Sequence, residues 1–155
     1  RSFTTVFNYR QRFTGDPFAD DTLRAVVATT GQANSAGRIN MALNELDHGV
    51  RIRKFRDGEA IDACEPPMPV NETQFGVSLR TQTHDSFTFD LNLQHTAWTE
   101  GVDRILHVMR RPVNIKGTNV SVGIEADVSV HWDSETKVIH SAADIAAYAQ
   151  SKGIM

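Results

Sequence analysis

Apolar and polar residues alternate along four stretches of the chain with a period of two. This period places successive side chains on opposite faces of a strand, so each stretch predicts a strand with one buried and one solvated face. Such strands are typical of an antiparallel sheet with one face in water. The apolar positions are Ile39, Met41 and Leu43; Phe75, Val77 and Leu79; Phe87, Phe89, Leu91 and Leu93; and Val120, Val122, Ile124, Ala126, Val128, Val130 and Trp132.

Short polar segments between these stretches predict hairpin turns. Residues 57–72 contain three prolines, which remove donors from a strand ladder, so this segment predicts a long loop. The predicted turns are Asp47-His48-Gly49 before a basic strand from Val50 to Phe55, Thr83 to Ser86 before the Phe87 strand, and Asp133 to Thr136 between the long strand and Lys137-Val138-Ile139.

The apolar period changes to that of a helix in two segments. One helix is predicted from Thr99 to Arg111, with Thr99 as its cap and Pro112 as its stop. Its apolar positions follow the spacing i, i+3, i+4 and i+7: Val102, Ile105, Leu106 and Met109. A second helix is predicted from Ser141 to Met155, where Ser141 can cap the first turn and Asp144 follows three residues later.

The first third of the chain has a weaker pattern. Thr4 to Phe13 is compatible with a strand, and Thr22 to Thr30 fits either a strand or a short helix. The small residues from Thr30 to Gly37 predict a connection, because they lack the lysine of a phosphate-binding loop.

Together these elements predict an α+β fold. We expect an antiparallel sheet of five to seven strands with one solvated face, covered on the other face by two helices. The two helices carry few large apolar side chains, so a dimer partner is expected to complete the core. The 155 residues suit a single domain, with a sheet and helix in residues 38–111 and an added hairpin and C-terminal helix in residues 112–155.

Composition narrows the class of protein. There are 16 Lys and Arg against 19 Asp and Glu, a net charge of −3, which disfavours a globally basic nucleic-acid binder. The lone cysteine, Cys64, excludes a disulfide scaffold and fits a reducing compartment, although it could pair with Cys64 of a second chain. No apolar run suits a membrane span or a signal peptide.

A basic run from Arg51 to Arg56 suggests contact with nucleic acid. Arginine binds phosphate through two parallel hydrogen bonds, and side-chain amides bind base edges. Candidate RNA contacts on one wet sheet face are Arg51, Arg53, Arg80, Asn40, Asn44 and Asn92. An ordinary solvated face is the alternative, since Asp57 and Glu59 follow the run directly.

Acidic and histidine residues suggest a second, enzymatic alternative. Paired carboxylates can divide acid and base roles, and histidine serves as base or metal ligand. In a small hydrolase or isomerase, a pocket would be lined by Asp90, His95, Glu125, Asp127 and His131, with carboxyl pKa values raised by burial. The ordinary interpretations are a solvated strand face for Glu125 and Asp127 and turn chemistry for His84-Asp85. No paired cysteines, HExxH motif or phosphate loop is present, so we predict no catalytic residue, metal or cofactor.

The order of elements from Arg38 to Arg111 resembles the coat proteins of the small single-stranded RNA bacteriophages. The shared features are Arg38-Ile39-Asn40-Met41-Ala42-Leu43, a turn, the basic strand, a proline-containing loop, the strands at Gly76–Arg80 and Phe87–His95, and a helix directly after them. The chain departs from that family in continuing for some 40 residues beyond this helix.

The resemblance implies a capsid protein rather than an enzyme. In that family the sheet of a dimer faces the enclosed RNA, and helices cover the outside and interlock with those of the partner. The implied partners are a second copy of the chain and single-stranded RNA, with no membrane. The implied location is a virion assembled in the bacterial cytoplasm, and residues 57–72 would form contacts between dimers.

Overall fold

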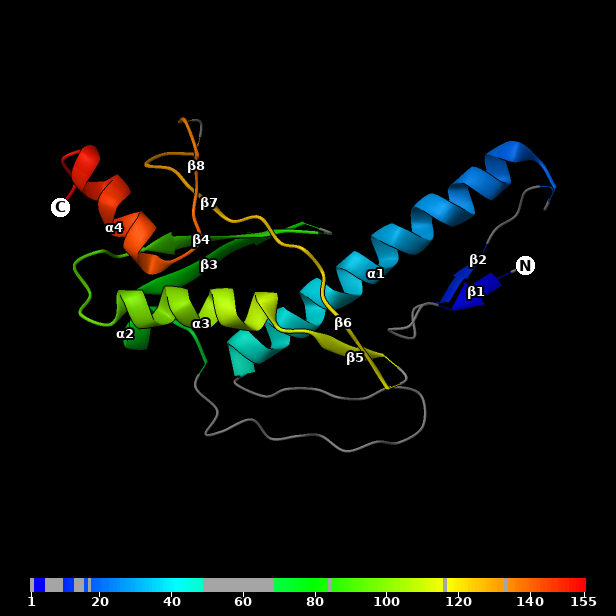
Figure 1. Cartoon of the computed structure of the whole chain (residues 1–155), viewed down its shortest axis with the longest axis horizontal. Helices are drawn as coiled ribbons and strands as arrows, with labels where there is room; N and C mark the ends of the chain where they lie inside the picture. Colours follow the sequence, from blue (N-terminus) through cyan, green and yellow to red (C-terminus); the bar gives the residue numbers. More distant parts are fainter. Residues whose placement is uncertain are drawn as a thin grey trace. The chain divides into compact units, whose positions relative to one another are not determined.

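The computed structural model describes residues 2–4, 10–12, 16, 18–48, 69–83, 85–115, 117–132 and 134–155. The elements occur in the order shown in Figure 1: β1 (Ser2–Thr4), β2 (Arg10–Arg12), α1 (Asp20–His48), α2 (Glu72–Phe75), β3 (Val77–Gln82), β4 (Phe87–Leu91), α3 (Trp98–Arg110), β5 (Val113–Ile115), β6 (Thr118–Val120), β7 (Asp127–Val128), β8 (Lys137–Val138) and α4 (Ala142–Ser151). Contacts divide the chain into two compact units. Unit 1 is Arg1–Pro69 with Thr81–Thr88, and unit 2 is Val70–Arg80 with Phe89–Met155.

The predicted sheet of five to seven strands is wrong. The described strands form four separate two-stranded sheets, β1-β2, β3-β4, β5-β6 and β7-β8. Three of them are antiparallel, with Phe3 opposite Gln11, Asn114 opposite Asn119, and Asp127 opposite Val138. The part of the chain that the structure describes has four helices rather than the two expected.

The largest difference is α1, which spans 29 residues as one helix. The sequence predicted a strand at Ile39–Leu43, and the helical alternative at Thr22–Thr30 proves correct. The same segment also has helical spacing, because Ile39, Ala42 and Leu46 lie three and four residues apart and are all buried. Arg38, Met41, Leu43 and Glu45 nearby have good helix propensity, which favours the helix over the alternation. Asp20 and Asp21 in the first turn stabilise the start of the helix.

The long strand predicted from Val120 to Trp132 is also wrong. β6 ends at Val120, β7 covers only Asp127–Val128, and residues 121–126 between them form no regular element. Val122 and Trp132 are exposed, so the alternating apolar positions do not form one buried face. Alternation produces a strand only where a neighbouring strand satisfies the backbone, and here that partner is β8, which is two residues long.

Several local predictions are confirmed. β3 and β4 pair across the predicted turn, where the Thr83 amide donates to the Ser86 carbonyl at 2.9 Å. The four-residue connection is too short for a parallel pair. Lys137–Val138 is the strand β8 as predicted. The single strand suggested for Thr4 to Phe13 is wrong, because Thr4 ends β1 and Arg10–Arg12 form β2, which pairs antiparallel with β1.

The boundaries of α3 and α4 agree with the prediction to within a few residues. α3 begins one residue before Thr99, so the predicted cap is wrong: the N-cap position is Ala97, whose side chain makes no capping bond. α4 is capped by Ser141 as predicted, with Asp144 completing a capping box. It ends at Lys152 and Gly153, and Gly153 adopts a φ of 68° that favours glycine.

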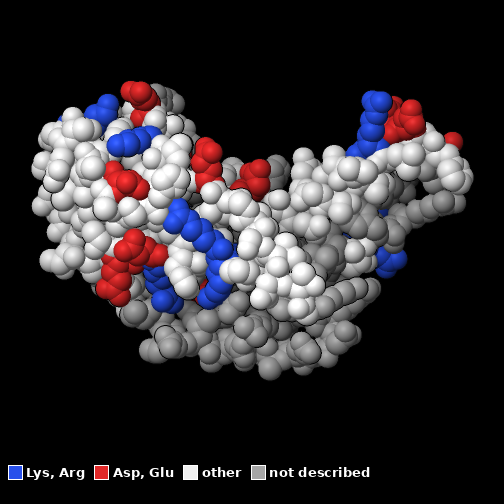
Figure 2. Space-filling view, in the orientation of Figure 1, with Lys and Arg blue, Asp and Glu red and all other residues white. Residues whose placement is uncertain are grey.

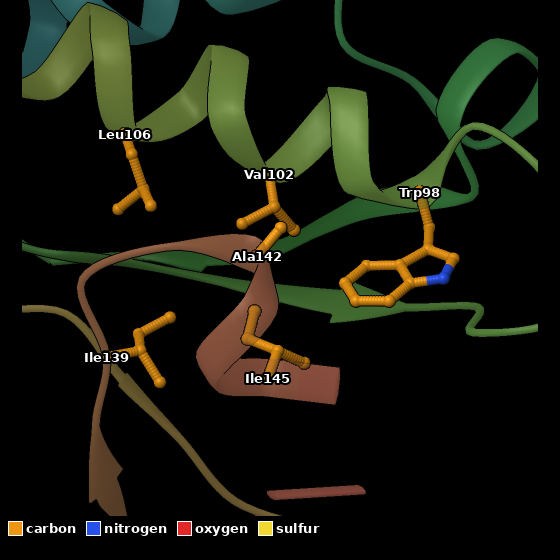
Figure 3. Packing of buried hydrophobic residues seen from close by; sticks show 6 residues of the cluster. All are labelled: Trp98, Val102, Leu106, Ile139, Ala142 and Ile145. Carbon is orange, nitrogen blue, oxygen red and sulfur yellow. The ribbon is translucent and has the colours of Figure 1, made fainter. Parts of the chain in front are cut away.

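Unit 2 has a hydrophobic core between α3 and α4. Figure 3 shows the side chains of the two helices directed toward one another. Leu91, Leu93, Ala126, Val128 and Ala146 pack against the edge of this cluster. The cluster consists of Trp98, Val102 and Leu106 from α3, Ile139 just before α4, and Ala142 and Ile145 from α4.

Some of the predictions concern residues that the structure does not describe. They are the basic strand from Val50 to Phe55, most of the loop 57–72 including Cys64, and His84 in the turn before β4. Within that loop, Asn71 caps α2 through a bond from the Gln74 amide, and Glu72 begins the helix. No described helix is both long enough and apolar enough to cross a membrane.

Close packing of α3 on α2 and β3 depends on Gly101. A Cβ atom at this position would lie 2.7 Å from Phe75 Cβ and 2.9 Å from Val77 Cγ2. Phe75 and Val77 are both buried, so neither side chain has room to move away.

We therefore expect Gly101→Ala to lower the free energy of unfolding by about 1–3 kcal/mol, the usual cost of overpacking a core. Urea unfolding followed by circular dichroism measures this loss. The matched control is Gly123→Ala, where nothing lies within 4 Å of the added Cβ and the change should stay within about 0.5 kcal/mol. Equal stability of the two variants would contradict the close approach.

Candidate functional site

The predicted RNA-binding residues do not share a sheet face among the residues that the structure describes. Asn40 and Asn44 belong to the helix α1, Arg80 lies on β3, and Asn92 follows β4. Arg51 and Arg53 lie outside the described residues. The common platform required the strand at Ile39–Leu43, so the placement of these residues on one sheet is wrong.

Each described member of this set already contacts another part of the chain. Arg80 Nε donates to Asp90 Oδ2 at 2.6 Å, which offsets its charge on an exposed surface. Asn40 Oδ1 accepts a bond from Gln82 Nε2 at 2.7 Å, and this bond joins α1 to the end of β3 within unit 1. Asn44 Nδ2 donates to the Asn40 carbonyl, and Asn92 Oδ1 accepts from the Gln94 amide.

The enclosed pocket of carboxylates and histidines is likewise not found in the described chain. Glu125, Asp127 and His131 are exposed, and Asp90 is engaged by Arg80. The His95 ring contacts the backbone at both nitrogens, through the Thr73 carbonyl and the Ala97 amide, each at 3.2 Å. No group of three or more acidic, histidine or cysteine side chains among the described residues is placed to hold a metal ion.

One face of α1 exposes apolar and small residues. Leu23 is 50% exposed and Val27 is 75% exposed, and the two are one helical turn apart. A Cβ added to Gly31, one further turn along, would have no atom within 4 Å. Residues 25–37 contain no charged side chain, and Figure 2 shows a largely uncharged surface along this part of the helix. We call Leu23, Val27 and Gly31 the α1 face.

Unit 2 has an open pocket of about 460 Å³ beside the C-terminal half of α3. Its volume falls within the range of small-molecule sites. The lining combines cationic, imidazole, apolar and acidic groups: Asp103, Leu106, His107, Arg110, Arg111, Pro112 and His140. We call this the α3 pocket.

Hydrogen bonds between α3 and the segment before α4 shape the α3 pocket. Arg110 Nη1 donates to the His140 carbonyl at 2.7 Å, and the His140 amide donates to Asp144 Oδ2, also at 2.7 Å. Asp103 Oδ1 accepts from the Ala142 amide at 3.4 Å. These bonds hold the segment that carries His140 against the helix that carries Arg110.

Sequence reasoning did not identify this pocket. It predicted a helix from Thr99 to Arg111 and gave no role to His107 or His140. The available signal was the spacing of Arg110 and Arg111, which lie three and four residues after His107 and so on the same side of the helix end. His140 joins them only through the packing of α3 on α4, which periodicity does not specify.

Hydrogen bonds to the Asp144 carboxylate lower its pKa below the ordinary value of 3.8. The main cause is the bond from the His140 amide, with further contributions from the Ser141 hydroxyl and amide, while partial loss of water acts in the opposite direction. A lowered folded-state pKa means that the ionised carboxylate stabilises the fold above its unfolded pKa, and that this stability is lost as the pH falls through the folded pKa.

We expect Asp144→Asn to lower the free energy of unfolding at neutral pH because the variant lacks the charged end of the capping box. The difference from the wild-type protein should shrink as the pH falls below about 3.8, since the wild-type carboxylate then becomes protonated. Urea unfolding at a series of pH values measures both curves. Glu125→Gln, which removes one exposed carboxylate elsewhere in unit 2, controls for the change in net charge. Parallel curves for the wild type and Asp144→Asn would contradict the assignment.

Comparisons of the chain with models of protein families, with curated proteins and with solved structures found no match.

Proposed function

We propose that this protein is a structural subunit that associates with copies of itself through the α1 face. The observation that carries the proposal is the exposure of Leu23 and Val27 on one side of a long helix. The narrower form of the proposal is a coat protein whose dimers close into an icosahedral shell around single-stranded RNA, as the resemblance implies.

Burial of the α1 face would supply a driving force for association. Burial of a fully exposed leucine or valine side chain contributes about 1.5–3 kcal/mol, and Leu23 and Val27 would gain this in proportion to their exposed fractions of 50% and 75%. A two-fold contact uses each residue twice. α1 is about 43 Å long at 1.5 Å per residue, so it offers room for an extended helix–helix contact.

The spacing of the α1 face favours a second copy of this chain as its partner. Leu23 precedes Val27 by four residues, and Gly31 follows Val27 by four. If two copies pack antiparallel about a two-fold axis at Val27, each Leu23 meets Gly31 of the other copy. The projecting side chain then enters the open space where Gly31 has none, so the surface is complementary to itself.

Charge supports the antiparallel arrangement. Asp20 and Asp21 lie in the first turn of α1, Arg24 follows in the next turn, and residues 25–37 are uncharged. A parallel pair would bring the acidic turns of the two copies together, where like charges repel. The antiparallel pair separates them and leaves an uncharged segment at the centre of the contact.

The RNA-containing form rests on the sequence resemblance and on the basic run that includes Arg51 and Arg53. The first strand that the resemblance implies, at Arg38–Leu43, is part of α1 in the structure. The proposed dimer therefore pairs helices and does not extend a sheet. It shares with the coat proteins only the interlocking of helices between two copies.

We expect the double variant Leu23→Glu with Val27→Glu to be monomeric under conditions where the wild-type protein is a dimer or larger, because four carboxylates would have to be buried in the two-fold contact. Size-exclusion chromatography with light scattering gives the mass. The matched control is Val122→Glu, which replaces an exposed valine outside α1 and should leave the mass unchanged. A monomeric wild-type protein, or equal masses for all three proteins, would contradict the proposed contact.

For the narrower form, we expect protein purified without denaturant to elute as a particle with nucleic-acid absorbance. Arg51→Ala with Arg53→Ala should reduce the RNA content, because fewer phosphates are neutralised. A dimer without nucleic acid would rule out the shell but would still agree with self-association through the α1 face. The broader and the narrower proposals are therefore tested separately.

A further inference from the structure

The α3 pocket gathers arginine and histidine side chains from two segments that are far apart in the sequence. His107, Arg110 and Arg111 come from α3 and its C-terminal end, and His140 comes from the segment before α4. None of the lining residues belongs to the α1 face or to the basic run at Arg51, so neither part of the proposed function uses the pocket.

The Arg110 guanidinium is held in place by its bond to the His140 carbonyl. A guanidinium has five N–H donors in a rigid plane, and this bond uses one of them. A long exposed side chain normally loses about 2 kcal/mol of rotamer entropy when a ligand immobilises it. Because the bond already restricts Arg110, part of that cost is met before a ligand arrives.

The position of His140 is also fixed before binding. Its amide donates to Asp144 and its carbonyl accepts from Arg110, so both polar groups of its backbone are engaged. The imidazole of His140 and the guanidinium of Arg110 line the same pocket. Together the two side chains can donate hydrogen bonds to different oxygens of one anion.

The two carboxylates near the α3 pocket are both engaged by backbone amides. Asp103 is the one carboxylate of the lining, and that group accepts a bond from the Ala142 amide at the start of α4. Asp144, which lies outside the lining, accepts bonds from the His140 and Ser141 amides. Arg110 bonds to a carbonyl rather than to either carboxylate, so its charge is available to an anion.

From this geometry we propose that the α3 pocket binds a phosphate group, with Arg110, His107 and His140 as its donors. Guanidinium groups match the paired oxygens of phosphate, and the apolar atoms of Leu106 and Pro112 can contact a sugar or base carried by that phosphate. A pocket of about 460 Å³ has room for a group of nucleotide size.

The same chemistry would accept the phosphomonoester of a small molecule or a phosphodiester of a nucleic-acid strand. The pocket is open to solvent on one side, so a strand could continue past it. The test therefore uses three ligands at low salt: inorganic phosphate, uridine monophosphate and a short oligouridylate.

We expect binding of inorganic phosphate and uridine monophosphate to shift the amide resonances of residues 107–111 and 140 in heteronuclear NMR spectra of the whole chain. Arg110→Gln should weaken binding about five- to tenfold, because hydrogen bonds to charged groups are among the stronger ones. Lys137→Gln removes the same charge at an exposed position of unit 2 outside the pocket and should weaken binding less than twofold.

Two further variants separate loss of phosphate binding from a folding defect and from loss of self-association. His107→Gln removes an exposed lining side chain for which no role in packing is seen, so it should weaken phosphate binding even if Arg110→Gln fails to fold. The double variant at Leu23 and Val27 should bind phosphate as the wild type does, since the α1 face lies in the other unit. Failure of self-association and failure of phosphate binding are then distinguishable.

Binding of oligouridylate at least as tight as that of the mononucleotide, with loss in Arg110→Gln, identifies a nucleic-acid backbone as the source of the phosphate. Binding of the two small ligands alone supports a phosphomonoester site. The proposal is overturned if phosphate shifts none of these resonances, or if Arg110→Gln and Lys137→Gln weaken binding equally.

Discussion

The contact between α3 and α4 is the constraint on which the described part of unit 2 depends. Trp98, Val102 and Leu106 provide one side of it, and Ile139 and Ile145 provide the other. Once these side chains exclude water, the backbone before α4 must lie beside the last turns of α3. Arg110 can then reach the His140 carbonyl, and the α3 pocket forms as a consequence of core packing.

Local signals identified the elements of this contact. The helical spacing of Val102, Leu106 and their neighbours predicted α3, and the polar pair Ser141 and Asp144 predicted the start of α4. Both signals act over three or four residues, which is the range of a capping bond or a helical turn. The approach of His140 to Arg110 spans 30 residues and depends on side-chain shape, so the sequence alone did not reveal it.

The errors have a common physical origin. Ile39, Met41 and Leu43 alternate, yet Ile39, Ala42 and Leu46 also fit a helix, so the two periods coincide over one segment. From Val120 to Trp132 the alternation is longer, but a strand needs neighbours for its backbone groups. Hydrophobic pattern therefore limits the choice of element, while helix propensity and the availability of a pairing strand decide it.

The two proposed surfaces use opposite physical interactions, and salt should affect them in opposite directions. Contact through Leu23 and Val27 is apolar, so a kosmotropic salt such as sulfate strengthens it. Contact of a phosphate with Arg110 and His140 is electrostatic at an open pocket, so added salt screens it and sulfate also competes for the same donors. A shell that used both surfaces would keep its protein contacts and release its RNA as sulfate increased. Its assembly and its cargo would therefore be separable without any mutation.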